Sequence, residues 1–331
     1  AVSDKEDKSD SSSTGNALES RERMKILVIK LAALGDFVQA TGPFAAIREH
    51  HGGDHVTLLT TRPYADFAAS SGYFDEVWLD EKPSGLAVAK GLELRRRLCA
   101  GGFARVYDLQ TSDRTGWYFR LFWPGPRPEW SGKAKGCSHP HANPKRDFMH
   151  TIERQAEQLN MAGIKKVPPP DLSWAQADAA RFSLGKRHAL LVPGGAPRRP
   201  AKRWPYRRYL EVAQSLAATG IQPVLLGSDP EKEVLEAIAD KCKESVSLAG
   251  ETTFQDIAVL ARDAVCSLGN DTGPMHIIAV SGCPSVVLYS RDSDPALCAQ
   301  RGPDVTIISR RKLDDIEVNE VMAALKAACR D

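Results

Sequence analysis

The stretch that decides the fold is Gly269-Asn270-Asp271-Thr272-Gly273-Pro274-Met275-His276. A short apolar run, residues 264–268, precedes it, and a helix-competent run follows it until Gly282-Cys283-Pro284. The pattern predicts a strand, a tight turn and a helix. Asp271 or Thr272 can cap the helix, Gly273 allows close approach to the main chain, and the N–H groups at the helix start favour a phosphate. An ordinary capped helix without a ligand explains the same residues, so a diphosphate cradle is one of two interpretations.

A second pattern of strand, turn and helix lies near the start of the chain. Residues 24–30 form a buried-strand pattern, residues 31–36 form a small-residue turn that ends in Gly35-Asp36, and residues 37–49 show helical apolar spacing. Asp36 stands where the N-cap is expected, which is its structural interpretation. The carboxyl end of the first strand is also where doubly wound domains place their chemistry. The turn lacks G-x-G-x-x-G, which argues against a nicotinamide-dependent dehydrogenase.

These stretches resemble the family 9 glycosyltransferases, the bacterial heptosyltransferases of lipopolysaccharide core assembly. Five elements of the family's pattern occur in the family's order between about residues 24 and 325: Lys30, Gly35-Asp36 with Thr41 and Pro43, Lys202-Arg203-Trp204-Pro205, Gly227 to Glu231, and Asp271 to His276. The chain departs from the pattern at an extra Gly42, in the Pro- and Arg-rich loop before Lys202, and at Tyr289-Ser290-Arg291-Asp292. These departures concern the sugar and the acceptor more than the reaction.

The resemblance implies an α/β fold of the GT-B architecture, with two Rossmann-like, doubly wound parallel-sheet domains facing a central cleft. It implies an inverting, metal-independent transferase that moves a heptose or similar sugar from a nucleotide diphosphate donor, ADP-heptose by analogy, to a lipopolysaccharide core or related glycan. Asp36 would be the general base. No cofactor is implied beyond the nucleotide-sugar substrate, and the acceptor would be a glycan or lipid-linked glycan.

Composition excludes several other classes of protein. The chain has 331 residues and a formal net charge of +2, without the basic footprint of a nucleic-acid-binding protein. Its seven cysteines are scattered and form no C-x-x-C pair, which favours a reduced, cytoplasmic setting. It has neither an apolar run of the ~20 residues that a spanning helix needs nor a signal segment. We therefore expect a cytoplasmic protein that is at most peripheral on the inner face of the cytoplasmic membrane.

The order of apolar runs predicts four segments. Residues 1–23 have too little apolar content to pack and are expected to be a disordered tail. Residues 24–167 alternate strands and helices, as a parallel α/β sheet requires, and form the expected acceptor-side domain. A proline-rich linker follows at residues 168–173. Residues 174–331 repeat the alternation and form the expected nucleotide-sugar domain, with strands near residues 189–192, 223–226, 245–248, 265–268, 285–289 and 305–309. Its last helix, near residues 313–329, is a candidate for returning to the first domain.

The donor side offers residues for a diphosphate and its ribose. Lys202 lies in a basic loop after a strand that ends in Pro193-Gly194-Gly195, and its charge would stabilise a departing diphosphate, although a solvated loop lysine is the alternative. Glu231 is expected to accept ribose hydroxyls, or else to complement a helix dipole. His276 would orient sugar or phosphate, or be a satisfied helix histidine. Thr252 would line the nucleotide pocket, which a plain N-cap explains almost as well. The donor-binding set is therefore Gly194, Gly195, Glu231, Thr252, Asp271, Thr272, Gly273 and His276.

Two further regions have alternative interpretations. Cys137-Ser138-His139-Pro140-His141 matches no zinc spacing, so we expect a loop and no metal. Residues 116–123 are predicted to form a buried helix, with a membrane-facing aromatic patch as the alternative. The basic loop nearby, with Lys133, Lys145 and Arg146, is either solvated charge or the capture site for an acidic lipid-linked acceptor.

Other functions remain open at this stage. The chain could be a nucleotide-sugar-binding protein that has lost catalysis, or it could use the same chemistry on a protein or capsule acceptor. Retention of Asp36 and Lys202 argues against lost catalysis.

Overall fold

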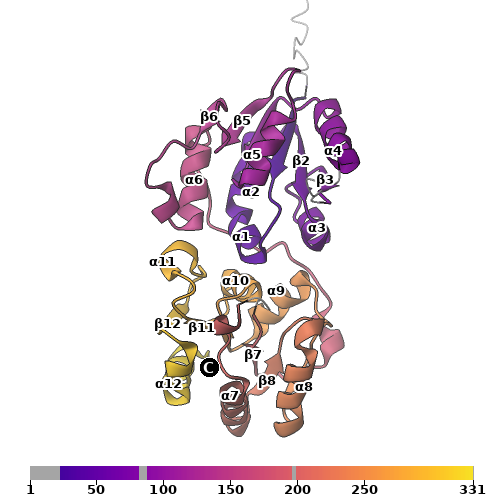
Figure 1. Ribbon diagram of the computed structural model, residues 1–331. Helices are drawn as coiled ribbons and strands as arrows, with labels where there is room; N and C mark the ends of the chain where they lie inside the picture. Colours follow the sequence, from indigo (N-terminus) through magenta and orange to yellow (C-terminus); the bar gives the residue numbers. More distant parts are fainter. Residues whose placement is uncertain (1–22, 82–87, 196–198, 331) are drawn as a thin grey trace, which may run out of the picture.

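The computed structural model describes residues 23–81, 88–195 and 199–330 and shows two stacked halves (Figure 1). Apart from Arg23, the expected N-terminal tail lies outside the described residues. Within the described chain, each half contains a six-stranded parallel sheet. The prediction of two Rossmann-like halves is confirmed.

The first half holds the sheet order β3-β2-β1-β4-β5-β6. Its strands are β1 (Lys25–Ile29), β2 (His55–Thr60), β3 (Glu76–Leu79), β4 (Arg105–Asp108), β5 (Glu129–Gly132) and β6 (His139–Pro140). Its helices are α1 (Leu34–Gln39), α2 (Thr41–His50), α3 (Arg62–Ala69), α4 (Val88–Ala100), α5 (Asp113–Arg120) and α6 (Thr151–Met161), with a 3₁₀ turn η1 (Arg146–Phe148). Strands β5 and β6 were not predicted, because they are short and polar. The segment expected to be a loop, Cys137 to His141, supplies β6.

The second half repeats the pattern in the order β12-β11-β10-β7-β8-β9. Its strands are β7 (His188–Val192), β8 (Gln222–Leu225), β9 (Val246–Ser247), β10 (Cys266–Asn270), β11 (Ser285–Tyr289) and β12 (Val305–Ser309), all within two residues of the predicted bounds. Its helices are α7 (Tyr206–Ala218), α8 (Lys232–Lys241), α9 (Phe254–Asp263), α10 (Gly273–Val280), α11 (Pro295–Cys298) and α12 (Val318–Ala328). Four 3₁₀ turns join them: η2 (Ala179–Phe182), η3 (Pro200–Lys202), η4 (Asp229–Glu231) and η5 (Leu313–Asp315).

Both sheets have a point where the strand order reverses. In the first sheet it lies between β1 and β4, where Ile29 pairs with Asp108. In the second it lies between β7 and β10, where Val192 pairs with Gly269. Connections diverge on either side of such a point and leave a crevice at the carboxyl ends of the strands, where ligands of open α/β sheets bind. The two predicted glycine turns follow β1 and β10, so each lies at one of these crevices.

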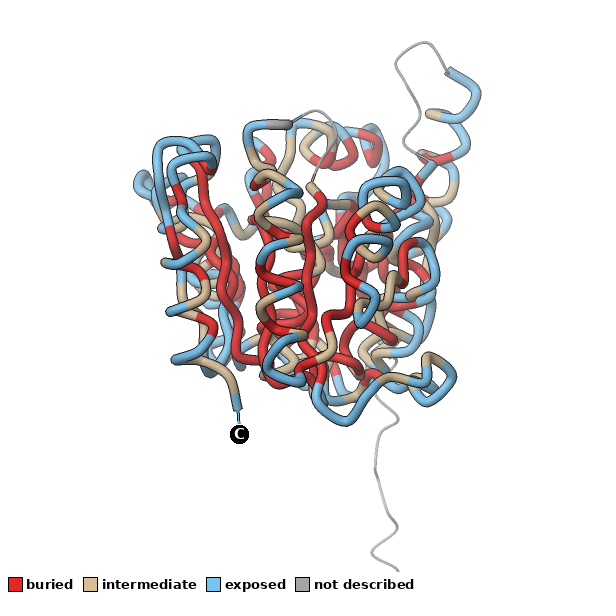
Figure 2. The backbone as a smooth tube through the Cα atoms, turned by 90° about the horizontal axis from the view of Figure 1, so that it is seen from below, coloured by how far each residue is buried: buried red, intermediate tan, exposed pale blue. Residues whose placement is uncertain are grey.

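The central strands β1, β2, β7, β10 and β11 are buried, whereas the edge strands β3, β6, β9 and β12 are partly exposed (Figure 2). Burial of the central strands is expected for parallel sheets with helices on their faces. One apolar core continues from the first half into the second. Phe254 of α9 lies 5.6 Å from Phe67 and 6.2 Å from Tyr64, both on α3, measured between ring centroids. The halves are therefore packed against each other rather than joined only by a linker.

The predicted linker explains the extra glycine of α2. A Cβ atom added at Gly42 would lie 2.2 Å from the carbonyl oxygen of Pro168. The main-chain N–H of Asp171 donates to Thr41 Oγ1 at 3.1 Å. Gly42 is thus needed so that the chain between the halves can pass directly over α2.

The expected return of the last helix is wrong. Val321 and Leu325 of α12 are buried in the core of the second half, with Val286 and Leu288 of β11. The apolar face of α12 is satisfied there, so it has none left for the first half. Among the described residues, no helix is long and apolar enough to cross a membrane.

Candidate active site

The starts of α1 and α10 meet where the two halves contact each other (Figure 1). Each helix offers a glycine to a side chain of the other. A Cβ at Gly35 would lie 2.6 Å from Cδ2 of His276, and a Cβ at Gly273 would lie 2.7 Å from Cβ of Leu34. Gly273 therefore has a packing role that the sequence did not predict. Because neither glycine has a side chain, the two predicted turns can approach each other this closely.

Asp36 is the third residue of α1 and lies in the first turn. The expectation that it is the N-cap is wrong: Ala33 is the N-cap, because the helix begins two residues before Asp36. Among the described residues, its half-buried carboxylate has no hydrogen bond or ion pair. Lys30 and His276 are close enough to interact with it electrostatically. A carboxylate that caps nothing remains able to accept a proton from a ligand.

Two buried polar atoms at the start of α10 lack partners. Thr272 is the N-cap residue, but its Oγ1 caps nothing and has no hydrogen bond among the described residues. His276 Nδ1 is equally unpaired. Burial lowers the pKa of His276 to about 4, so the ring is neutral at pH 7. Buried polar groups without partners are costly, which points to a ligand that supplies the missing contacts.

Asp271 does not cap α10 but holds Lys202. Its Oδ2 accepts from Lys202 Nζ at 2.7 Å and from Ser293 Oγ at 2.6 Å, and its Oδ1 accepts from Gln300 Nε2 at 3.2 Å. Burial opposes the charge on Asp271, but the hydrogen bonds from Lys202 and Ser293 outweigh it and lower the pKa of the carboxyl. Lys202 is therefore a tethered cation rather than the solvated loop lysine of the alternative interpretation.

Glu231 bonds to the loop after β7. Glu231 Oε1 accepts from the Gly195 N–H at 2.9 Å, and Oε2 accepts from the Ser228 N–H at 2.8 Å. A Cβ at Gly194 would lie 1.8 Å from Glu231 Oε1, so only glycine fits there. The structure thus brings together Gly194, Gly195 and Glu231, three of the predicted donor-binding residues.

Asn270 is a site residue that the sequence reasoning missed. It is fully buried at the end of β10. Its Nδ2 donates to the carbonyl oxygens of Pro193 and Gly194 at 2.8 and 3.0 Å, and its Oδ1 accepts from the Trp204 N–H at 3.1 Å. Asn270 therefore links the loop after β7, the segment after Lys202 and the start of α10. A buried amide next to Asp271 was the available signal.

Thr252 is half-buried and does not cap α9. The cap is Thr253, whose Oγ1 accepts from the Asp256 N–H at 3.1 Å while Asp256 Oδ2 accepts from the Thr253 N–H at 2.8 Å. The side chain of Thr252 has no hydrogen bond to the part of the chain that the structure describes, and its role in nucleotide binding stays a prediction.

The three predicted acceptor residues differ in their surroundings. Arg146 is buried, not solvated: its Nη2 donates to Thr111 Oγ1 at 2.8 Å and its Nε to His141 Nδ1 at 3.1 Å. Lys145 is exposed, and Lys133 lines a pocket at the start of α5. Arg146 therefore stabilises the turn after β4 from inside, whereas neither lysine has an ion pair with another described residue.

Asp108, at the end of β4, is a second residue that the sequence reasoning missed. Its Oδ1 accepts from the N–H groups of Gln110 and Thr111 at 3.1 and 2.8 Å, while its buried Oδ2 has no partner among the described residues. Burial raises the pKa of Asp108 to about 6. Asp108 and Lys30 thus place two buried ionisable groups at the crevice that holds Asp36.

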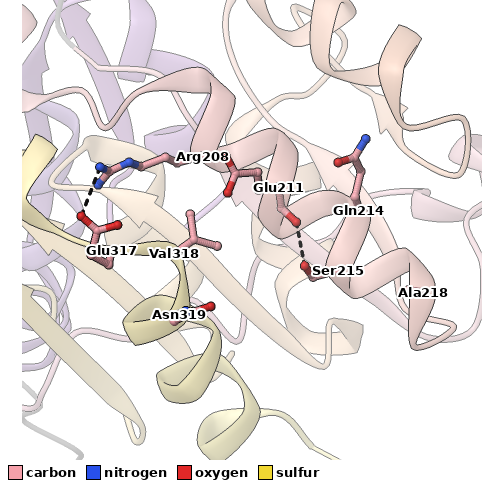
Figure 3. A pocket seen from close by; sticks show the side chains of 8 residues that line it. All are labelled: Arg208, Glu211, Gln214, Ser215, Ala218, Glu317, Val318 and Asn319. Carbon is pink, nitrogen blue, oxygen red and sulfur yellow. Dashed lines mark hydrogen bonds and ion pairs between the residues drawn. The ribbon is translucent and has the colours of Figure 1, made fainter.

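A groove between α7 and α12 lies elsewhere in the second half (Figure 3). It is crossed by an ion pair at 3.4 Å between Arg208 Nη2 and Glu317 Oε1. None of the predicted site residues lines it. Among the described residues, no group of three or more His, Cys, Asp or Glu side chains could hold a metal ion.

Two doubly wound halves, whose glycine turns meet where the halves contact each other, define the GT-B class of fold. The model of glycosyltransferase family 9 (heptosyltransferase) matches residues 92–325. The chain belongs to this family, and the resemblance seen in the sequence is confirmed.

Three individual relatives are identical to this chain at about a third or fewer of the aligned residues. Lipopolysaccharide heptosyltransferase 2 of Salmonella typhimurium is 33% identical over 151 residues, which cover 40% of this chain and 42% of that protein. The alignment thus spans less than half the length of this curated relative. The structure of E. coli ADP-heptose lipopolysaccharide heptosyltransferase II has a TM-score of 0.74 at 23% identity, covering 92% of this chain and 98% of that one. An E. coli heptosyltransferase solved with ADP has a TM-score of 0.72 at 19% identity, covering 92% and 100%.

Proposed function

We propose that this protein transfers a heptose or similar sugar from a nucleotide diphosphate donor, ADP-heptose, to a lipopolysaccharide core or related glycan. The observation that carries the proposal is the contact between α1 and α10, which brings the unpaired carboxylate of Asp36 within electrostatic range of His276. His276 Nδ1 and Thr272 Oγ1, the unpaired polar atoms, both belong to the start of α10. The relatives named above support the sugar, the nucleotide and the acceptor by analogy.

The donor diphosphate would bind at the start of α10. The first N–H groups of a helix have no intrahelical partner and attract anions. Thr272 Oγ1 and the neutral ring of His276 would complete the contact. Lys202, held by Asp271 just before α10, would add its positive charge to this contact. Glu231, already bonded to the Gly195 N–H, is the acceptor available to ribose hydroxyls.

The reaction would be a single displacement that inverts the anomeric carbon. The acceptor hydroxyl attacks that carbon and its proton passes to Asp36, while the bond from the sugar to the diphosphate breaks. Negative charge then grows on the leaving diphosphate, where Lys202 and the start of α10 stabilise it more strongly than in the ground state. These two groups supply the positive charge that a metal would otherwise supply, so metal independence is part of the proposal.

The proposal is tested by donor binding and by the loss of Asp36. In calorimetric titrations with ADP, GDP and UDP, we expect ADP to bind most tightly. Asp36→Asn should retain ADP affinity within several-fold and lose turnover, because the amide cannot take a proton. Asp66→Asn, an exposed carboxylate of α3, is the matched control and should keep both. If ADP does not bind, or if Asp36→Asn turns over normally, the proposal is wrong.

A further inference from the structure

The outer sides of α4 and α5 expose large apolar side chains. Val88 and Leu92 of α4 are 68% and 60% exposed, and Trp117 of α5 and Trp123 just beyond it are 44% and 66% exposed. Val88 and Leu92 are one helical turn apart and share a face. The buried face of α4 is a different one, formed by Leu94 and Leu98. Val88 and Leu92 therefore lie on a face of α4 that does not pack on the core of the first half.

Trp117 and the main chain of Trp123 both lie against α4. A Cβ at Gly91 of α4 would lie 3.7 Å from Cη2 of Trp117. Arg95 Nη2, also on α4, donates to the carbonyl oxygen of Trp123 at 3.4 Å. Both tryptophans thus lie beside the same helix, α4, and continue its apolar face. Scattered surface apolar residues are ordinary, but contiguous ones indicate an interaction site.

The core of the first half does not need the two tryptophans. Tyr118, Phe119 and Phe122 of the same segment are buried, and Phe119 and Phe122 pack on Trp130 at 5.3 and 6.3 Å between ring centroids. The sequence predicts a buried helix for residues 116–123, with a membrane-facing aromatic patch as the alternative. The structure shows that one face of the segment is buried and the other carries Trp117 outward.

Positive charge lies next to Trp117. A pocket beside it is lined by three exposed cations, Arg120, Lys133 and Lys135, against one carboxylate, Asp113. Among the described residues, none of the three cations has an ion pair. Their charge is therefore available to an anionic partner outside the molecule.

We propose that this α4–α5 face (Val88, Leu92, Trp117 and Trp123 with Arg120, Lys133 and Lys135) docks on the surface of an anionic lipid bilayer. Tryptophan favours the membrane interface, and an apolar face next to basic residues is the pattern of peripheral membrane binding. Lysine is depleted in protein–protein interfaces, which disfavours a protein partner. Each basic residue near an anionic surface increases binding about fivefold. The inference does not depend on the proposed reaction.

The experiment is co-sedimentation of the full chain with vesicles. We expect binding to vesicles that contain phosphatidylglycerol, much weaker binding to pure phosphatidylcholine, and a decrease as salt screens the charges. Trp117→Gln combined with Trp123→Gln should weaken binding at least tenfold, and Lys133→Glu combined with Lys135→Glu should remove the preference for anionic lipid.

The matched control is Tyr206→Gln combined with Val234→Gln, two exposed apolar positions in the second half, which should bind vesicles as the native chain does. Circular dichroism checks that each variant folds, and ADP affinity of the tryptophan variant tests the donor site separately. The proposal is overturned if the native chain ignores anionic vesicles, if the tryptophan variant binds them equally well, or if the face instead drives self-association that this variant abolishes.

Discussion

Replacement of Gly35 by alanine tests the contact that brings the two glycine turns together. The added methyl would lie 2.6 Å from Cδ2, 2.7 Å from Nε2 and 3.3 Å from Cε1 of His276. Carbon atoms pack best at about 3.5–4.0 Å, so one group must retreat by about 1 Å. The His276 ring is buried and has little room to move. Gly35 is helical, so its backbone conformation does not require glycine.

The expected cost follows from this overlap. Adding a methyl to a packed site destabilises by about 1–3 kcal/mol. Because Asp36 is the next residue, it should shift with α1, and a misplacement of about 1 Å can reduce turnover about a hundredfold. ADP affinity should change less, because most of the donor contacts lie in the second half.

Three measurements decide the outcome: urea unfolding, calorimetric ADP affinity and the rate of ADP release with donor and acceptor. Gly53→Ala is the matched control, since nothing lies within 4 Å of an added Cβ there and its φ is not positive. We expect the control to stay within about 0.5 kcal/mol of the native chain. If Gly35→Ala has the same free energy of unfolding and the same turnover rate as the native protein, the contact between α1 and α10 does not position Asp36.

Three further outcomes are expected. Lys202→Ala should lower turnover by about a hundred- to a thousandfold and ADP affinity by less, with partial recovery in Lys202→Arg; equal losses of both would make Lys202 a binding group only. Burial raises the pKa of Asp108 to about 6. Between pH 4 and 6 the folded state therefore keeps a proton that the unfolded state loses. As the pH rises through this range, Asp108 lowers the free energy of unfolding by about 3 kcal/mol. Burial lowers the pKa of His276 to about 4, and this residue raises the free energy of unfolding by a similar amount as the pH increases. The two contributions oppose each other in the native chain. In Asp108→Asn only that of His276 remains, so the free energy of urea unfolding should increase more steeply with pH between 4.5 and 6.5. A chelator such as EDTA should leave turnover unchanged, and strong inhibition would contradict the proposed roles of Lys202 and the start of α10.

Much of the fold was predictable because strands and helices depend on neighbours a few positions apart. The apolar runs before Gly35-Asp36 and Asp271-Thr272 became β1 and β10, and the runs after them became helices. Strands β5 and β6 were missed because their few residues carry no alternating apolar pattern, and they form only by pairing, β5 with β4 and β6 with β5. The turn at Asp36 was found, but its role as N-cap was wrong, since the helix start depends on backbone geometry that residue type only biases.

The sequence by itself determined the class of the protein: two α/β halves, a glycine turn in each, and the set of polar residues at those turns. Only the tertiary structure showed that Gly35 receives the His276 ring, that Gly42 lies beneath Pro168, and that Asp271 holds Lys202 instead of capping a helix. The reason is physical. Residue type and spacing specify which secondary structure a segment can form. Whether a side chain is buried, and which group it bonds to, depends on which distant segments pack against it. The same residue can therefore cap a helix, hold another side chain or contact a ligand.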